Sequence, residues 1–391
     1  MKRNMRQDFN TSMDALHFSR ETKENMVSLL MQEEKEQPMY QKHPSRKRAM
    51  VIALAATLIL ATMTGAAVFT RWSKTMQTSY NPSQQIKEQA ENSGLSVMLE
   101  ETKGTENPNE VLSVTDQGIT ITAVQTIVDN YQAQITFRIE GFDLPEGELP
   151  AVWPIVTIGG DPHFGGLQSG WFYDGLTQNA EGKTVYASNG QPVQSDEDGC
   201  LILDLVDDDG SLEYTHFISF EQTDGRYLGK EIAFTFHSID FQSHQKAGIP
   251  EPQVEGLWEL KWTLTGTDSN MKVSPNVQIG DSDVTLLDAE IGQVSIRTRY
   301  QLKDYWEGWD ELVELPQAVQ GVRMKDGREF LCTPGTSGFE DQEKMVYFIE
   351  SRMFNAILDI SQVESLMFHK GWERDENGNP TNQTFYYIPI Q

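Results

Sequence analysis

The stretch Gly118-Ile-Thr-Ile-Thr-Ala-Val-Gln-Thr-Ile-Val-Asp-Asn-Tyr-Gln-Ala-Gln-Ile-Thr-Phe-Arg-Ile-Glu140 decides the fold class, because apolar and polar residues alternate at both of its ends. Isoleucine and threonine alternate over 119–122, and apolar residues alternate with threonine and arginine over 135–139. A period of two is typical of strands that are buried on one face. The sequence therefore predicts two half-buried β-strands here.

Short alternating runs of the same kind recur toward the C-terminus, separated by turn signals. One convincing hairpin has Val322 and Met324 before the Asp326-Gly327 turn and Phe330 after it. Many short strands without long helical patterns between them predict a mainly β protein built from two immunoglobulin-like antiparallel β-sandwich modules. The other apolar runs are Phe234/Phe236, Trp258/Leu260/Trp262/Leu264, Val294/Ile296/Tyr300 and Tyr386/Ile388/Ile390.

A weak internal echo of the opening stretch occurs over 284–298 and supports two modules. We place their joint in the polar stretch Thr265 to Asn270. The expected domains are a cytoplasmic helical segment, a transmembrane helix, a polar stalk with one short helix, a first β-sandwich and a second β-sandwich. Their ranges are 1–48, 49–69, 70–110, 111–269 and 270–391.

The run from Ala49 to Phe69 contains no charged residue and predicts a transmembrane helix. Its 21 residues would rise roughly 32 Å as a helix, which matches a hydrocarbon core of about 30 Å. The basic flank at 42–48 keeps the N-terminus cytoplasmic by the positive-inside bias. Trp72 lies where an interfacial aromatic anchor would. A cleaved signal peptide remains an alternative, since small residues occur at 65–67.

Charge is distributed unevenly along the chain, whose formal net charge is −27. Residues 1–48 hold ten Lys/Arg and seven Asp/Glu, a net of +3, which leaves 21 Lys/Arg against 51 Asp/Glu, a net of −30, after the apolar run. Such a field repels nucleic acid, so the predicted outer region is not expected to bind DNA or RNA. Solubility is the simplest reason for the acidity.

The N-terminal segment is expected to form two short helices, the second running from Ser19 to about Glu36 before Pro38. Its apolar stripe is too large for two short helices to bury by themselves. It either lies on the inner membrane surface or docks on a cytoplasmic partner, and the residues of the stripe proposed for partner binding are Met26, Val27, Leu29 and Leu30.

No local signature of a hydrolase or phosphate-binding loop occurs, so no catalytic residue, cofactor or metal site is predicted and the protein is not expected to be an enzyme. The remaining polar and aromatic features are explained more simply as turns, strand edges and core residues than as binding sites. Weak surface calcium binding at Asp207–Gly210 and ligand binding by an aromatic loop stay open. The features considered are His163, His237, His244, Asp207–Gly210, Glu373–Gly378, the Trp153–Tyr173 loop, and Cys200 and Cys332 as an unindicated disulfide.

Several of these segments together resemble a known family, the uncharacterised Gram-positive single-pass membrane proteins with an ectodomain called domain of unknown function 4179. The likeness covers nearly the whole chain and includes the single span. It implies an anti-sigma-factor-like protein whose inner segment holds a sigma factor and whose outer immunoglobulin-like region is a sensor. The segments that carry the resemblance are Leu16–Ser19 leading into Lys23–Leu30, Gln117–Thr120, Gly256–Leu260 and Asp359–Leu366.

Two functions from different classes follow from this organisation. The first is a regulatory membrane protein whose inner helices contact a cytoplasmic factor, with a sigma factor as the candidate, and whose outer region senses a ligand. The second is a surface adhesin or wall-associated binding protein with an inert inner segment. Fold alone does not decide between them.

Overall fold

The computed structural model describes ten stretches of the chain, all in the unit Gly65–Gln391, which is separate from the unit Met1–Thr64. The predicted inner helices and the apolar run 49–69 lie outside these stretches. Among the residues that are described, no helix has the length and apolar character needed to cross a membrane. The stretches are 72–99, 110–163, 166–179, 183–196, 199–220, 227–249, 252–303, 317–340, 345–374 and 380–390.

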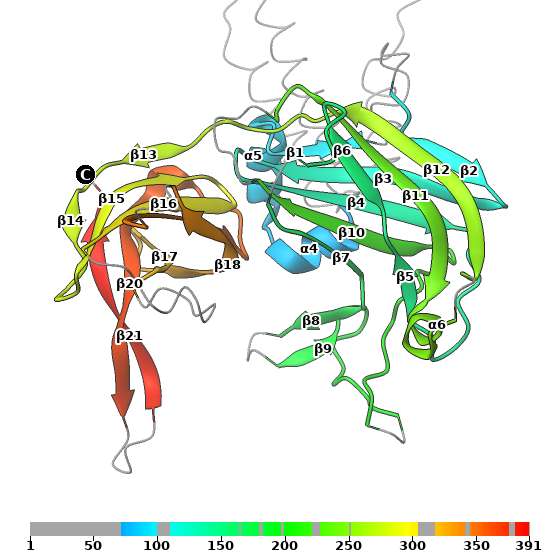
Figure 1. The fold of residues 1–391 in the computed structure, drawn as a ribbon. Coiled ribbons are helices and arrows are strands. Elements are labelled where there is room, and N and C mark those ends of the chain that lie inside the picture. The colour runs from blue at the N-terminus through cyan, green and yellow to red at the C-terminus, as the bar shows by residue number, and fades with distance from the viewer. Residues whose placement is uncertain are drawn as a thin grey trace, which may run out of the picture. The chain divides into compact units, whose positions relative to one another are not determined.

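The prediction of a mainly β fold with antiparallel sheets is confirmed (Figure 1). In the first group of strands, one sheet has the order β1-β3-β4-β10-β7, and β2 also pairs with β3. A second sheet has the order β12-β11-β5, and β6 also pairs with β11. The first sheet consists of β1 (Ser96–Met98), β2 (Ser113–Asp116), β3 (Ile119–Val128), β4 (Gln132–Glu140), β7 (Gln168–Phe172) and β10 (Leu212–Ser219). The second consists of β5 (Pro150–Val152), β6 (Ile155–Ile158), β11 (Glu231–Phe241) and β12 (Val254–Thr263), with helix α6 (Gln242–Ala247) after β11 and the separate hairpin β8 (Leu176–Gln178) and β9 (Thr184–Tyr186).

The opening stretch forms the β3–β4 hairpin, whose strands are buried on both faces rather than one. Ile121 and Phe137 face a core that both sheets share. On the opposite face Gln125 and Thr136 are also buried, because the N-terminal end of helix α4 (Lys74–Tyr80) covers them. Threonine and glutamine in these strands therefore face a packed helix rather than solvent.

The segment predicted as a polar stalk is folded over its described part, 72–99. It forms α4, helix α5 (Gln84–Asn92) and β1, and α4 lies against β10 (Figure 1). Ser73 and Ser83 cap the two helices with their side-chain oxygens. The segment is polar on average, but Trp72, Met76 and Tyr80 are spaced four residues apart. In a helix this spacing places all three on one side, and that side is buried.

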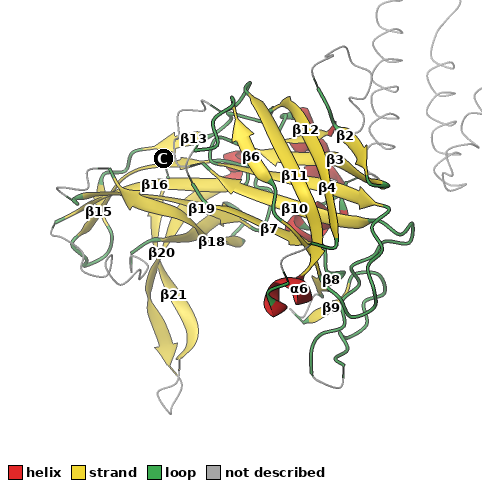
Figure 2. Cartoon of the chain, turned by 45° about the vertical axis from the view of Figure 1, so that its right-hand side comes forward, coloured by secondary structure: helices red, strands yellow, loops and turns green. Residues whose placement is uncertain are grey.

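The second group is a nine-stranded antiparallel sheet with the order β13-β15-β16-β19-β18-β17-β20-β21, and β14 also pairs with β15. Strand β18 pairs with β17 through its first residues and with β19 through its later ones, so it joins two parts of the sheet. Figures 1 and 2 both show the β20–β21 ribbon extending away from the other strands. The strands are β13 (Met271–Val273), β14 (Val277–Gln278), β15 (Val284–Ile291), β16 (Ser295–Leu302), β17 (Val319–Met324), β18 (Glu329–Phe339), β19 (Tyr347–Phe354), β20 (Val363–Arg374) and β21 (Pro380–Pro389).

The predicted β17–β18 hairpin is confirmed, with its turn at Asp326-Gly327 and a hydrogen bond of 2.8 Å from the Met324 amide to the Arg328 carbonyl. The residues of the first large apolar core end at Leu264, and those of the second begin with Met271. The ranges assigned to the domains stay a prediction. Cys200 and Cys332 are both free thiols.

Candidate functional site

Glu213 on β10 holds the N-terminus of α4 in place. Its carboxylate accepts hydrogen bonds from the backbone N–H groups of Lys74 (3.0 Å) and Thr75 (2.6 Å). A carboxylate at this position satisfies two otherwise unpaired donors and complements the positive end of the helix. Burial nevertheless raises the pKa of Glu213. The first turn of α4 is therefore fixed to the middle of the first sheet.

A third apolar cluster, which we call the junction cluster, joins the N-terminal helices to both groups of strands. Ile127 comes from β3, Val294 from the turn before β16, and Ile357 from the segment after β19. The cluster therefore packs the N-terminal helices, the first strand group and the second strand group against one another. The junction cluster consists of Trp72, Met76, Tyr80, Ala90, Leu95, Met98, Ile127, Val294 and Ile357.

Trp72 does not act as the interfacial anchor that the sequence suggested. Its ring is buried, its Nε1 donates a hydrogen bond of 2.6 Å to Glu91, and the Lys87 ammonium lies 5.6 Å from the ring centroid. Because the indole ring is buried and its N–H is bonded within the protein, it is not available as an anchor at a membrane surface.

Two hairpin turns meet beside the junction cluster: the β3–β4 turn at 129–132 and the β15–β16 turn at 292–295. Asp129 accepts 2.9 and 3.1 Å hydrogen bonds from two amides of its own turn and a 2.5 Å bond from the Ser295 hydroxyl. Gln132 donates to the Val294 carbonyl at 3.0 Å. A Cβ on Gly292 would lie 2.7 Å from the Asp129 carboxylate, so this close approach requires glycine. Burial raises the pKa of Asp129 to about 6, despite the hydrogen bonds that oppose the shift.

Glu290 on β15 extends this polar contact. Its carboxylate accepts hydrogen bonds from the Tyr131 hydroxyl and, at 2.9 Å, from the Asn270 amide, and its other oxygen lies 3.1 Å from the Lys272 ammonium. Tyr131 belongs to the β3–β4 turn, whereas Glu290 belongs to the second strand group. The junction thus combines apolar packing with buried hydrogen bonds.

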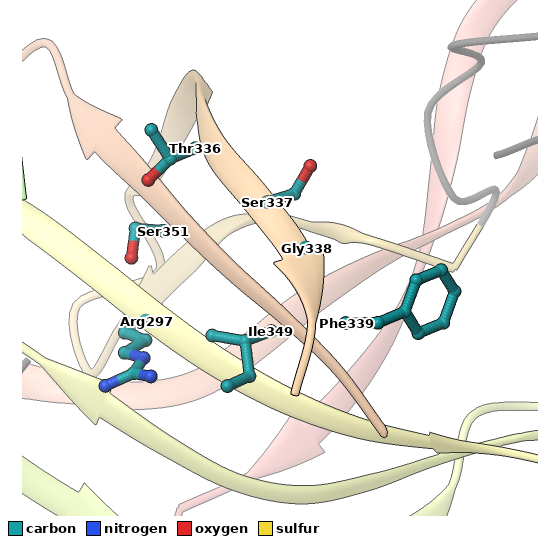
Figure 3. A pocket seen from close by; sticks show the side chains of 7 residues that line it. All are labelled: Arg297, Thr336, Ser337, Gly338, Phe339, Ile349 and Ser351. Atoms are coloured by element: carbon teal, nitrogen blue, oxygen red, sulfur yellow. The ribbon is translucent and has the colours of Figure 1, made fainter. Parts of the chain in front are cut away.

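On the strand next to Glu290, the nine-stranded sheet forms a small pocket of about 200 Å³ (Figure 3). Arg297, Ser351 and Thr336 follow one another across β16, β19 and β18 as direct cross-strand partners. Figure 3 shows these three side chains in a row, with Ile349 beside Arg297. The seven residues that line the pocket are Arg297, Thr336, Ser337, Gly338, Phe339, Ile349 and Ser351.

Two residues that line the pocket, Arg297 and Thr336, also contact side chains of the first strand group. The guanidinium of Arg297 lies 5.9 Å from the ring centroid of Tyr131, a cation–π contact. The Thr336 hydroxyl lies 3.0 Å from the Ser219 hydroxyl at the end of β10. Whatever binds at Arg297 and Thr336 therefore acts on side chains that contact both groups of strands.

A buried ion pair occupies the opposite, core-facing side of β19. Arg352 and Glu350 approach to 2.8 Å, and Tyr300 donates a 3.4 Å hydrogen bond to Glu350. Burial raises the pKa of the Glu350 carboxyl and lowers that of the Arg352 guanidinium, because neither charge is solvated. The pair is part of the core and does not face the pocket.

A second cavity, of about 510 Å³, lies between α4 and the loop 204–208. Lys74, Asp204, Asp207 and Asp208 are among its lining residues, and Lys74 pairs with Asp207 at 2.6 Å. Asp207–Gly210 is a turn, as predicted, closed by a 2.8 Å hydrogen bond from the Gly210 amide to the Asp207 carbonyl. Across the described stretches, no group of three acidic, histidine or cysteine side chains could hold a metal ion.

The other residues singled out from sequence are not brought together into one site. His163 and His237 are exposed, and His244 pairs with Asp240 at 2.9 Å. In the aromatic loop Trp153 and Trp171 are exposed whereas Tyr173 is buried. Most of Glu373–Gly378 lies outside the described residues, as do the proposed partner-binding residues Met26, Val27, Leu29 and Leu30.

Sequence reasoning missed the Arg297 pocket, although the run Ser295-Ile-Arg-Thr-Arg-Tyr300 carries a signal for it. Arg297 and Arg299 fall on the same face of a strand, so an acidic residue or another anion is expected beside at least one of them. Which neighbouring strands supply that partner depends on the sheet order, and the sequence does not give it.

No protein-family model matches the chain, and no curated protein matches it. One solved structure is similar, the crystal structure of the conserved domain protein from Bacillus anthracis. It is 12% identical, with a TM-score of 0.41, and the match covers 72% of this chain and 90% of that chain.

Proposed function

We propose that this chain is a single-pass membrane regulator of the anti-sigma-factor-like kind. In this proposal the N-terminal segment lies in the cytoplasm and contacts a sigma factor or another regulator. The run 49–69 spans the membrane, and the acidic region outside consists of two immunoglobulin-like β-sandwich modules that sense a ligand. Support comes from the uncharged run, its basic flank and the two separate cores that divide after Leu264.

The observation that carries the proposal is the junction cluster. Phe69 ends the uncharged run, and Trp72, three residues later, is already buried against the protein. Met76 and Tyr80 then pack with Ile127 and Val294, which belong to different strand groups. A change in how the two groups contact each other therefore acts directly on the first residues after the predicted span.

An adhesin has no need for this connection, because its anchor only has to hold the outer region at the surface. A flexible polar stalk, which the composition suggested, would serve an adhesin well. A sensor instead needs a rigid path from the ligand-binding region to the membrane, and packed side chains that contact several elements provide one. The folded juxtamembrane segment therefore favours the regulator.

The test uses the full-length chain in its native cells. Affinity purification is expected to recover a specific cytoplasmic protein with the wild type, and to lose it when Met26→Asp and Leu30→Asp place charges on the apolar stripe. Lys23→Ala on the polar face is the matched control and should retain the partner. Equal recovery from all three proteins, or unchanged function after deletion of residues 1–36, would favour the adhesin and refute the regulator.

A further inference from the structure

Two arginines lie on one face of β16, and of these two only Arg299 makes ion pairs with the described residues. Arg299 makes two hydrogen bonds to Glu340, at 2.7 and 2.9 Å, and lies 3.7 Å from Asp288. The Arg297 guanidinium makes no ion pair or hydrogen bond with a residue in the described stretches. It lies 5.9 Å from the ring centroid of Tyr131, and Glu290, Asp288 and Glu340 attract it only from a longer distance. Arg297 thus keeps a planar set of donors available.

Arg297 lacks an ion pair with the described residues because the acidic residue opposite it, Glu290, is bound by other side chains. Each arginine faces an acidic residue across the β15–β16 pair, Asp288 for Arg299 and Glu290 for Arg297. The Glu290 carboxylate, however, is already bound by the Tyr131 hydroxyl and by the Asn270 and Lys272 side chains. The junction therefore takes away the acidic partner that the sheet register would give to Arg297.

Burial destabilises the charged form of the Arg297 guanidinium and so lowers its pKa. A partly desolvated cation interacts more strongly with an anion than an exposed one does. On the neighbouring strand, the buried Ser351 hydroxyl also makes no hydrogen bond to a described residue, and Thr336 lies beyond it. These groups are complementary to one anion with two or three oxygens.

We propose that the Arg297 pocket binds a small carboxylate, whose two oxygens face the guanidinium and accept a further hydrogen bond from Ser351. Arginine recognises carboxylates and phosphates with the same fork of donors. The net charge of −30 after the apolar run disfavours a phosphate dianion more than a carboxylate monoanion. The pocket, at about 200 Å³, is below the roughly 300 Å³ typical of drug-sized ligands, and Ile349 and Phe339 suit a short apolar substituent.

Binding would also affect the junction, because Arg297 stacks on Tyr131 and Thr336 contacts Ser219. An occupied pocket would hold these side chains of the first strand group in one arrangement. That consequence rests on the proposed function, whereas carboxylate binding itself does not. Failure of the sensor role and failure of binding are therefore separate results.

The experiment measures binding of propionate to the full-length chain in detergent at low ionic strength, by saturation-transfer NMR of the propionate protons. A dissociation constant on the order of 1 mM is expected for so small a ligand. Propionamide, its neutral isostere, should bind at least tenfold more weakly, and so should inorganic phosphate. Arg297→Gln should weaken propionate at least tenfold, and Ser351→Ala about threefold, the effect of one hydrogen bond.

Arg299→Gln is the matched control, since it removes an arginine that lies on the same face of the same strand but does not line the pocket. It should bind propionate as the wild type does. Equal binding of propionate and propionamide, tighter binding of phosphate, or wild-type affinity in Arg297→Gln would each overturn the assignment. If Arg297→Gln does not fold, Ser351→Ala and the comparison of propionate with propionamide on the wild type decide the question.

Discussion

Replacement of Asp129 by asparagine should change how the stability of the protein depends on pH. The Asp129 carboxyl is buried between two hairpin turns and accepts hydrogen bonds from Tyr131, Gln132 and Ser295. Asparagine has the same shape, and its carbonyl can accept the two backbone bonds. The Ser295 hydroxyl can turn to accept a hydrogen bond from the amide. The variant therefore keeps the hydrogen bonds with Tyr131, Gln132 and Ser295 and removes the titration.

The magnitude follows from the raised pKa, which is about 6 in the folded protein against an ordinary value of 3.8. Because the folded-state pKa is the higher one, the stabilisation from this proton is fully present below pH 3.8 and is lost as the pH rises through about 6. At roughly 1.36 kcal/mol per pKa unit, the loss amounts to about 3 kcal/mol. The tyrosines that face Asp129, Tyr80 and Tyr131, have raised pKa values and do not titrate in this range.

Urea unfolding followed by tryptophan fluorescence, at pH values from 4 to 7, measures the effect. The difference in unfolding free energy between the variant and the wild type isolates Asp129 from all other titrating groups. The variant should match the wild type near pH 4 and exceed it by about 3 kcal/mol at pH 7. A difference that stays constant over this range, or one that shrinks as the pH rises, would refute the reasoning.

Three further predictions concern other parts of the structure. Glu350→Ala or Arg352→Ala alone should reduce the unfolding free energy by about 3 to 5 kcal/mol, because each removes one member of a buried ion pair, whereas replacing both with apolar residues of similar volume should reduce it much less in the same assay. Met76→Ala should reduce it by about 2 to 5 kcal/mol, since Met76 is fully buried in the junction cluster, and faster hydrogen exchange over 72–99 would report the loosened helix. A thiol reagent should label Cys200 much faster than Cys332 in the native protein, because Cys200 is exposed whereas Cys332 is only partly exposed and burial raises its pKa; equal labelling rates of the two thiols in the native state would contradict this.

Local patterns in the sequence were sufficient to predict the class of fold. Alternation at Ile119 and Ile121 and the Asp326-Gly327 turn each reflect interactions among neighbours in the chain, which the sequence displays directly. The polar stalk was predicted wrongly because averaging over its composition concealed the four-residue spacing of Trp72, Met76 and Tyr80. The same error made β3 and β4 look half-buried, since the helix that covers their second face was not expected.

The candidate pocket could not be predicted, because its residues meet only through the order of strands in the sheet. Arg297, Ser351 and Thr336 are adjacent across strands, although up to 54 positions separate them in the sequence. The availability of Arg297 depends further on Tyr131, a residue of the other strand group that binds Glu290. Long-range pairing of this kind has no local signature.

The proposed function requires that the acidic β region lies outside the membrane, so that a ligand bound there can act on the inner segment. Exposed Cys200 provides a direct test, because a membrane-impermeant maleimide reaches only extracytoplasmic thiols in intact cells. Cys200 should be labelled in intact cells, and the signal should vanish in Cys200→Ser. Labelling of Cys200 only after the cells are permeabilised would contradict the account.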